Sequence, residues 1–257
     1  MTATELAEDL IRHAEQVMGT VVSIHVRPGP VPPDQVWRAL AEARHRLHRA
    51  DAVFSTWKSE SPMSRLRRGE ITLSEAPAEM ASVLDRCSTA KEWSAGWFDP
   101  WAAPAGVDPT GLVKGWAAHQ SLRALADAGV EAAMVSAGGD VATFGERAPA
   151  RPWRIGVQNP FDRATIAAVV ESPGAVATSG AYERGHHVFD PFRGTAADHL
   201  ASATVTGPEL DLADALATGL LAGGRPVMER ICERDGYQAM VIGLDGTITA
   251  TAGFPRV

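Results

Sequence analysis

Two side chains in the segment ADALAT, at 213–218, are of the types that metal-assisted phosphoryl chemistry requires. Asp214 and Thr218 lie four residues apart, so both oxygens project from one face of a predicted helix. A carboxylate and a hydroxyl suit a hard cation such as Mg²⁺, which also borrows phosphate oxygens. The alternative, which this pair alone favours, is that Asp214 interacts with the helix dipole and Thr218 bonds back to the helix backbone.

A lysine near a predicted helix start is the second candidate. In DPTGLVKG, at 108–115, Gly111 precedes a helix that has Lys114 in its first turn. Backbone amides and an ammonium at this position can bind an anion, whereas a surface lysine with a solvated head is the simpler alternative. The segment is not a Walker A loop, because the spacing differs and no Ser or Thr follows Lys114.

The segment VATSGAYERGHHVFDPFRG, at 176–194, is dense in polar and titratable groups. His187 lies in a β-like run, and strand alternation places it on the face opposite to His186. Beside a metal–phosphate site, His187 could remove a proton from a hydroxyl nucleophile or contact the ligand, although a lone strand histidine is usually structural. Asp190-Pro191 is predicted to form a turn in which Asp190 bonds its own loop backbone.

Paired glycines and paired histidines carry weaker signals. Gly138 and Gly139, in SAGGDV, allow either a tight bend or the close approach of a ligand, and the bend is favoured. They form no GxGxxG motif, so a Rossmann cofactor site is not supported. His45 and His48 share a predicted helix face, but zinc needs a third ligand, and a solvated face is the expected interpretation.

Composition narrows the protein class. The chain has 257 residues, 45% of them hydrophobic and 21% charged, which suits a folded globular domain. A formal net charge of -7 argues against a broad nucleic-acid surface.

No run is long and apolar enough for a membrane span, and the N-terminus has no signal-like apolar region, so a cytoplasmic protein is expected. Cys87 and Cys232, in separate helical patterns, are expected to be reduced and mostly buried.

Periodicity predicts helices joined to strands by tight turns. Helices are expected over 4–16, 34–52 with Asp34 as the N-cap, 62–66, 76–95, 112–128 and 212–224. Strands are expected over 18–26, in two runs within 132–145, in IGVQNP, in two runs within 165–180, in HHVFDP, in LASATVTGPEL, and in a hairpin within 238–251 that turns at Asp245-Gly246. This order favours an α+β fold with largely antiparallel sheets, in one domain over 1–257 with a helical extension over 1–16.

The motifs occur in an order that resembles one family. They are MGT at 18–20, FSTW and SRL between 54 and 66, FDP at 98–100, DxxGxxKG at 108–115, GGD at 138–140, ATSGAYERxHHVFDP from 177 and ADALAT. Together they resemble the ApbE family of FAD:protein FMN transferases, over nearly the whole chain. The resemblance implies a T-fold-related architecture that binds FAD with Mg²⁺. It further implies transfer of FMN to a Thr or Ser hydroxyl of an acceptor protein that carries a flavinylation motif, through a phosphoester bond, with release of AMP.

The resemblance also assigns roles to residues. It implies that Asp214 and Thr218 hold Mg²⁺, with a backbone carbonyl at or near Gly111 as a third ligand, and that His187 is the catalytic base. The residues that fall where the family contacts FAD are Met18, Trp57, Trp97, Phe98, Asp99, Asp108 and Lys114.

Some positions depart from the family pattern, and two other functions stay open. Trp57 stands where Tyr is common, which changes ring stacking, and WAAPAG replaces the usual segment after FDP. Some relatives hydrolyse FAD to FMN and AMP with the same metal site, and the sequence does not separate hydrolysis from transfer. A non-catalytic flavin-binding protein is the third interpretation, but such a protein need not keep His187, Asp214 and Thr218.

Overall fold

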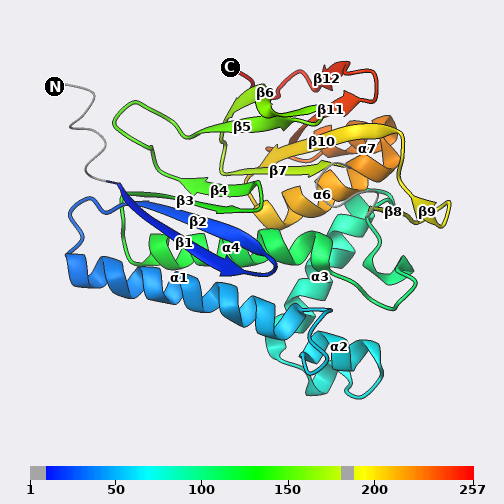
Figure 1. Cartoon of the computed structure of the whole chain (residues 1–257), viewed down its shortest axis with the longest axis horizontal. Helices are drawn as coiled ribbons and strands as arrows, with labels where there is room; N and C mark the ends of the chain where they lie inside the picture. The colour runs from blue at the N-terminus through cyan, green and yellow to red at the C-terminus, as the bar shows by residue number, and fades with distance from the viewer. Residues whose placement is uncertain (1–9, 181–187) are drawn as a thin grey trace.

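An eight-stranded antiparallel sheet forms the centre of the computed structural model, which describes residues 10–180 and 188–257 (Figure 1). The strand order is β1-β2-β3-β4-β7-β10-β11-β12, and each neighbouring pair is antiparallel. The strands are β1 Ile11–Val17, β2 Thr20–Arg27, β3 Ala132–Ala137, β4 Asp140–Phe144, β7 Ala175–Gly180, β10 Leu200–Gly207, β11 Gln238–Gly243 and β12 Ile248–Ala250. The predicted alternation in β2 is confirmed, since Val22, Ile24 and Val26 are buried.

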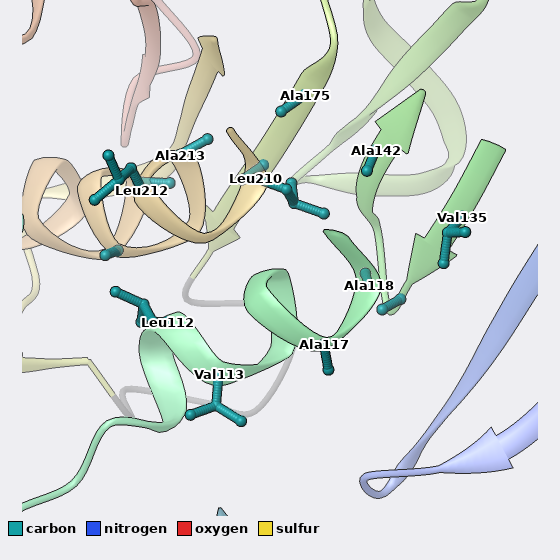
Figure 2. Close-up of a cluster of buried hydrophobic side chains, with 14 of the residues drawn as sticks. Leu112, Val113, Ala117, Ala118, Val135, Ala142, Ala175, Leu210, Leu212 and Ala213 are labelled. Carbon is teal, nitrogen blue, oxygen red and sulfur yellow. The ribbon is translucent and has the colours of Figure 1, made fainter. Parts of the chain in front are cut away.

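Helices cover one face of this sheet (Figure 1). The helices that contact strands are α1 Pro33–Phe54, α4 Thr110–Asp127, α6 Leu210–Gly223 and α7 Arg225–Cys232. Helix α2 Pro62–Arg67 packs on α1, and α3 Ala78–Trp93 packs on α4 and α6. Two short 3-10 turns are η2 Leu73–Glu75 and η3 Pro100–Ala102. Figure 2 shows Leu112 of α4 and Leu210 of α6 in the layer that these helices share with Ala142 and Ala175 of the sheet. Burial of these apolar side chains fixes α4 and α6 against each other and against the strands.

A two-stranded ribbon packs on the other face of the sheet. It consists of β5 Arg154–Asn159 and β6 Asp162–Glu171. A separate short sheet is formed by β8 Phe189–Asp190 and β9 Thr195–Ala196. Trp153, Val157 and Val170 bury themselves against Val141 and Val176 of the sheet. The structure therefore confirms the predicted α+β class with largely antiparallel sheets.

The N-terminal prediction is wrong where the structure describes it. Residues 11–16 belong to strand β1 and not to a helix, and residues 1–9 lie outside the described part of the chain. β1 pairs along its length with β2, and Glu15 of β1 contacts Arg44, His13 and His48. Sheet pairing and these ion pairs outweigh a helical pattern that lacks partners of its own.

The start of α1 also differs from the prediction. The helix begins at Pro33, and Asp34 lies inside its first turn, where it pairs with Arg38 across 2.6 Å. Proline is favoured at the first helical position because its missing N–H has no partner there in any case. The predicted N-cap at Asp34 is therefore wrong, although its charge still complements the helix dipole.

The structure also bears on the predictions made for the cysteines and for the histidines of α1. Cys87 is buried, as predicted, but Cys232 is exposed, so the prediction of two buried thiols is wrong for Cys232. His48 lies 3.0 Å from Glu15, and within the described residues no three His, Cys, Asp or Glu side chains gather as metal ligands. None of the described helices has the length and apolar character needed to cross a membrane.

Candidate functional site

One cavity of about 910 Å³ brings the predicted site residues together. It opens between the C-terminal end of α1, the start of α4, the end of β7 and one face of α6. Every predicted site residue that the structure describes lines it: Met18, Trp57, Trp97, Phe98, Asp99, Asp108, Gly111, Lys114, Asp214 and Thr218. His187, the predicted base, lies outside the described residues. A volume of this size matches a site for a large organic ligand.

The predicted metal ligands lie on α4 and α6, which pack against each other. The Asp214 carboxylate is 3% exposed, and its Oδ2 accepts a hydrogen bond from the Gly115 amide at 3.0 Å. A Cβ placed on Gly111 would lie 3.3 Å from Thr218 Oγ1, which places the first turn of α4 against this hydroxyl. A carboxylate, a hydroxyl and a nearby backbone carbonyl are hard donors, so the set fits Mg²⁺ by its chemistry.

Ser179, on β7, adds a further hydroxyl to this group. Its Oγ lies 3.3 Å from Thr218 Oγ1, and it lines the same cavity. Ser179 belongs to the polar segment 176–194, in which Thr178 to Gly180 were predicted to shape the wall of the site, but no chemical role was predicted for its hydroxyl. Strand alternation could have identified Ser179, because neighbouring strand residues point to opposite sides. Thr178 directs its hydroxyl to Thr204 on β10, 3.0 Å away, and Ser179 faces α6.

Contacts outside the cavity hold the start of α6 in place. His119 Nδ1 accepts a hydrogen bond from the Leu210 amide at 3.2 Å, and burial lowers the pKa of His119. The Arg86 guanidinium contacts Asp211 through two nitrogens and Glu209 across 3.0 Å. His119 thus accepts one of the free amides at the N-terminus of α6, and Arg86 ties the acidic residues there to α3, one turn before Asp214.

Lys114 reaches the cavity from α4 and pairs with Asp140, the first residue of β4. Asp140 is fully buried, and its Oδ1 accepts a hydrogen bond from the Thr178 amide at 3.0 Å. Before it, Gly138 and Gly139 both have positive φ, of 58° and 96°, which confirms the predicted bend. No role was predicted for Asp140, although it is the last residue of the GGD motif at 138–140.

Aromatic and sulfur-containing side chains form the apolar part of the wall. Phe98 is buried, whereas Trp57 is 94% exposed at the rim. Trp97 packs against Phe192 with ring centroids 4.6 Å apart. Met18 occupies the two-residue turn between β1 and β2 with φ of 54°, a strained conformation for a bulky residue, and it lies at the cavity. Flat rings and a thioether suit a flat heteroaromatic ligand.

Asp99 and Asp108, two of the carboxylates that line the cavity, have structural contacts. Asp99 accepts a hydrogen bond from the Trp101 amide at 3.0 Å and pairs with Lys91 across 2.8 Å. Asp108 accepts one from the Thr110 amide at 3.0 Å, at the start of α4. Both side chains thus shape the loop that leads into α4, and both line the cavity.

The predicted turn at Asp190-Pro191 is confirmed. Asp190 is buried, and its Oδ1 accepts hydrogen bonds from the amides of Phe192 at 2.9 Å and Arg193 at 3.0 Å. Phe189 and Val188, just before the turn, line the cavity. The turn therefore holds the chain that follows His187 against the cavity wall.

Solved structures share this fold. The flavin transferase ApbE from Vibrio cholerae aligns with a TM-score of 0.82 at 22% identity, over 96% of this chain and 99% of that one. The ApbE protein from Thermotoga maritima aligns with a TM-score of 0.83 at 22% identity, over 96% and 100% of the two chains.

Sequence comparisons agree with the fold. An FAD:protein FMN transferase from Salmonella typhimurium is 32% identical over 151 residues, which are 54% of this chain and 43% of that protein. One from Rhodobacter capsulatus is 34% identical over 155 residues, 56% of this chain and 29% of that protein. The chain thus spans less than half the length of these curated relatives. The sequence model of the ApbE family matches residues 18–107 and 102–241, so the chain belongs to the ApbE family.

Proposed function

We propose that the protein transfers FMN from FAD to a Thr or Ser hydroxyl of an acceptor protein and releases AMP. One observation carries this proposal: a single cavity joins a cluster of oxygen donors, a lysine and a set of aromatic side chains. The relatives named above are FAD:protein FMN transferases, which supports FAD as substrate and a protein as acceptor. In this proposal the acceptor lies in the cytoplasm or on the inner side of the membrane.

Mg²⁺ fits the donor set, and Asp214, Thr218 and the carbonyl at Gly111 would hold it. When bound, Mg²⁺ supplies positive charge that neutralises the pyrophosphate of FAD. Lys114 adds a second positive charge at the cavity wall. The aromatic side chains and Met18 hold the flavin or the adenine and exclude water from that part of the cavity.

His187 serves as the base in this proposal. It accepts the proton of the acceptor hydroxyl, whose oxygen then attacks the phosphorus of the FMN half of FAD. A new P–O bond forms to the acceptor, the pyrophosphate P–O bond breaks, and AMP leaves with the electron pair. In the hydrolytic alternative, water takes the place of the hydroxyl and free FMN is the product.

An assay with one acceptor peptide separates these reactions. The protein is incubated with FAD, MgCl₂ and a peptide that carries a flavinylation motif, and the peptide mass and released AMP are measured. An FMN-sized mass increase matched by AMP supports transfer. AMP and free FMN without that increase supports hydrolysis, and FAD binding without AMP contradicts both enzymatic functions.

A further inference from the structure

Asp140 is a fully buried carboxylate whose two oxygens have different partners. Oδ1 accepts a hydrogen bond from the Thr178 amide at 3.0 Å, and Oδ2 pairs with the Lys114 ammonium. A buried charge is costly unless it is paired and hydrogen-bonded. Both contacts end at cavity-lining residues, whereas Asp140 itself is not among the described residues that line the cavity.

The first contact extends the sheet where its backbone pairing stops. β4 pairs with β7 at Val141–Val176 and at Ala142–Ala175. Beyond this point β4 turns back through the Gly138–Gly139 hairpin, and the Asp140 side chain takes the Thr178 amide in place of a backbone carbonyl. The end of β7 is thereby fixed immediately before Ser179, the hydroxyl that faces Thr218.

The second contact restricts a flexible cation. Lys114 is a long side chain, 24% exposed, that has many rotamers in solution. The pair with Asp140 limits these rotamers before any ligand arrives, so the ammonium is already placed at the cavity wall. Binding of an anion then costs less conformational entropy than it would with an unrestrained lysine.

We propose that Asp140 is a positioning residue that holds the Lys114 ammonium where the pyrophosphate of FAD binds. This inference rests on the proposed function, because it takes FAD as the ligand. Asp140 acts through Lys114 and does not touch the ligand. A merely structural carboxylate would stabilise the fold without favouring one part of the ligand over another.

Two ligands distinguish positioning from general stabilisation. FAD carries the pyrophosphate, whereas riboflavin carries the same isoalloxazine ring without any phosphate. Asp140→Asn removes the charge but keeps an oxygen for the Thr178 amide. We expect Asp140→Asn to weaken FAD binding about tenfold and to leave riboflavin binding unchanged. Both dissociation constants are measured by calorimetry in the presence of MgCl₂.

A double-mutant cycle tests whether Asp140 acts through Lys114. Lys114→Met removes the cation, and the double variant is expected to bind FAD no more weakly than Lys114→Met alone. Glu131→Gln is the matched control, since it removes a carboxylate paired with Arg27 across 2.9 Å outside the cavity. It should change neither dissociation constant.

Three results would overturn the inference while leaving the proposed function intact. They are equal FAD binding by wild type and Asp140→Asn, an equal loss of FAD and riboflavin binding, and an undiminished Asp140→Asn effect in the Lys114→Met background. If the wild-type protein bound no FAD, the proposed function and this inference would both fail. Thermal unfolding of each variant, measured alongside, shows that the compared proteins are folded.

Discussion

The backbone amide of Gly115 on α4 donates a hydrogen bond to Asp214 on α6, with 3.0 Å between N and Oδ2. The absence of a side chain at position 115 makes this contact possible. A Cβ there would lie 2.6 Å from the Leu210 carbonyl oxygen and 2.9 Å from Asp214 Cβ. The two helices therefore cross closely at the turn that also carries Lys114, and the backbone of one orients a carboxylate of the other.

Gly115→Ala should displace Asp214 and destabilise the protein. A Gly-to-Ala change inside a helix normally stabilises it by about 1 kcal/mol. Here the added methyl group overpacks a buried crossing, and we expect a net loss of roughly 1–3 kcal/mol. Denaturant unfolding measures the loss, and a Mg²⁺ titration of AMP release should show a higher half-saturating concentration.

The control for Gly115→Ala also changes a single heavy atom of a helix residue, but at an exposed position. Ser88 is exposed on α3, so Ser88→Ala should leave both the free energy of unfolding and the Mg²⁺ titration close to wild type. If Gly115→Ala were as stable as wild type, with an unchanged Mg²⁺ requirement, the close crossing would not be what orients Asp214.

Asp214→Asn should abolish Mg²⁺-dependent turnover and leave the fold intact. The amide oxygen of Asn can still accept the hydrogen bond from the Gly115 amide, but a neutral amide is a poor ligand for a hard dication. Thr218→Val should raise the half-saturating Mg²⁺ concentration by at least about tenfold, whereas Thr218→Ser, which keeps the hydroxyl, should restore it. AMP release at varied Mg²⁺, with chelator-treated protein as the reference, is the measurement.

Unchanged turnover in Asp214→Asn would remove the metal assignment. Loss of turnover together with a large loss of stability would instead mark Asp214 as a structural contact of α4. Thr218→Val and Thr218→Ser separate these cases, because they differ in the hydroxyl and not in the Asp214–Gly115 contact.

Residue types and spacing marked Asp214, Thr218 and Lys114 as candidates, because each lies on predictable local structure, whereas the family resemblance supplied their roles and the remaining site residues. Asp214 and Thr218 share one helix face by periodicity, and Gly111 and Lys114 lie near the start of another helix. Spacing along the chain cannot show that these two helices cross at Gly115. That contact joins residues 99 apart and depends on packing of the whole layer between α4 and α6.

The features that the sequence mispredicted or did not predict at all concern residues whose conformation and burial are decided by distant partners. Residues 11–16 have a helical pattern of charges, yet β1 pairs with β2 in unbroken antiparallel register from Ile11 to Val17. Asp140 follows two glycines and resembles an ordinary turn residue. Its pair with Lys114 and its bond to Thr178 come from elements far along the chain, so its burial could not be predicted locally.

The stability of the protein should fall below neutral pH because of His119. Its Nδ1 accepts the Leu210 amide, so the folded state requires the unprotonated nitrogen. Burial is the largest cause that lowers the pKa of His119 below 6.5. The folded protein binds the proton less readily than the unfolded chain, so stability is fully present above pH 6.5 and is lost as pH falls through this value. The nearby charges are Asp211 and Glu209, which raise this pKa, and Arg123 and Arg86, which lower it.

His119→Gln isolates this contribution. His25 also has a pKa lowered by burial, so the wild-type pH profile contains more than one histidine. The comparison is therefore between wild type and His119→Gln, each unfolded with denaturant from about pH 7.5 to about pH 5.5. His119→Gln should lose less stability over this range, and parallel profiles would show that His119 does not control it.

The two cysteines should differ sharply in reactivity. Burial is the largest cause that raises the pKa of Cys87, to about 12, and the charges of Asp211 and Asp108 add to it. Cys232 is exposed, with its thiol 3.3 Å from the Met228 carbonyl. A thiol-specific reagent should label Cys232 in the native protein and both cysteines in denaturant. Cys232→Ser should abolish native labelling, whereas persistent labelling would place Cys87 at the surface.

Trp57 should contribute to ligand binding without contributing to stability. Its side chain is 94% exposed at the cavity rim, so Trp57→Ala should change the free energy of unfolding by less than about 0.5 kcal/mol. Loss of a stacking ring should weaken FAD binding about tenfold, whereas Trp57→Tyr should keep most of the affinity. Trp37 on α1 is the matched control: it is 56% exposed and lies outside the residues that line the cavity. Equal effects of Trp57→Ala and Trp37→Ala on the FAD dissociation constant would show that Trp57 does not contact FAD.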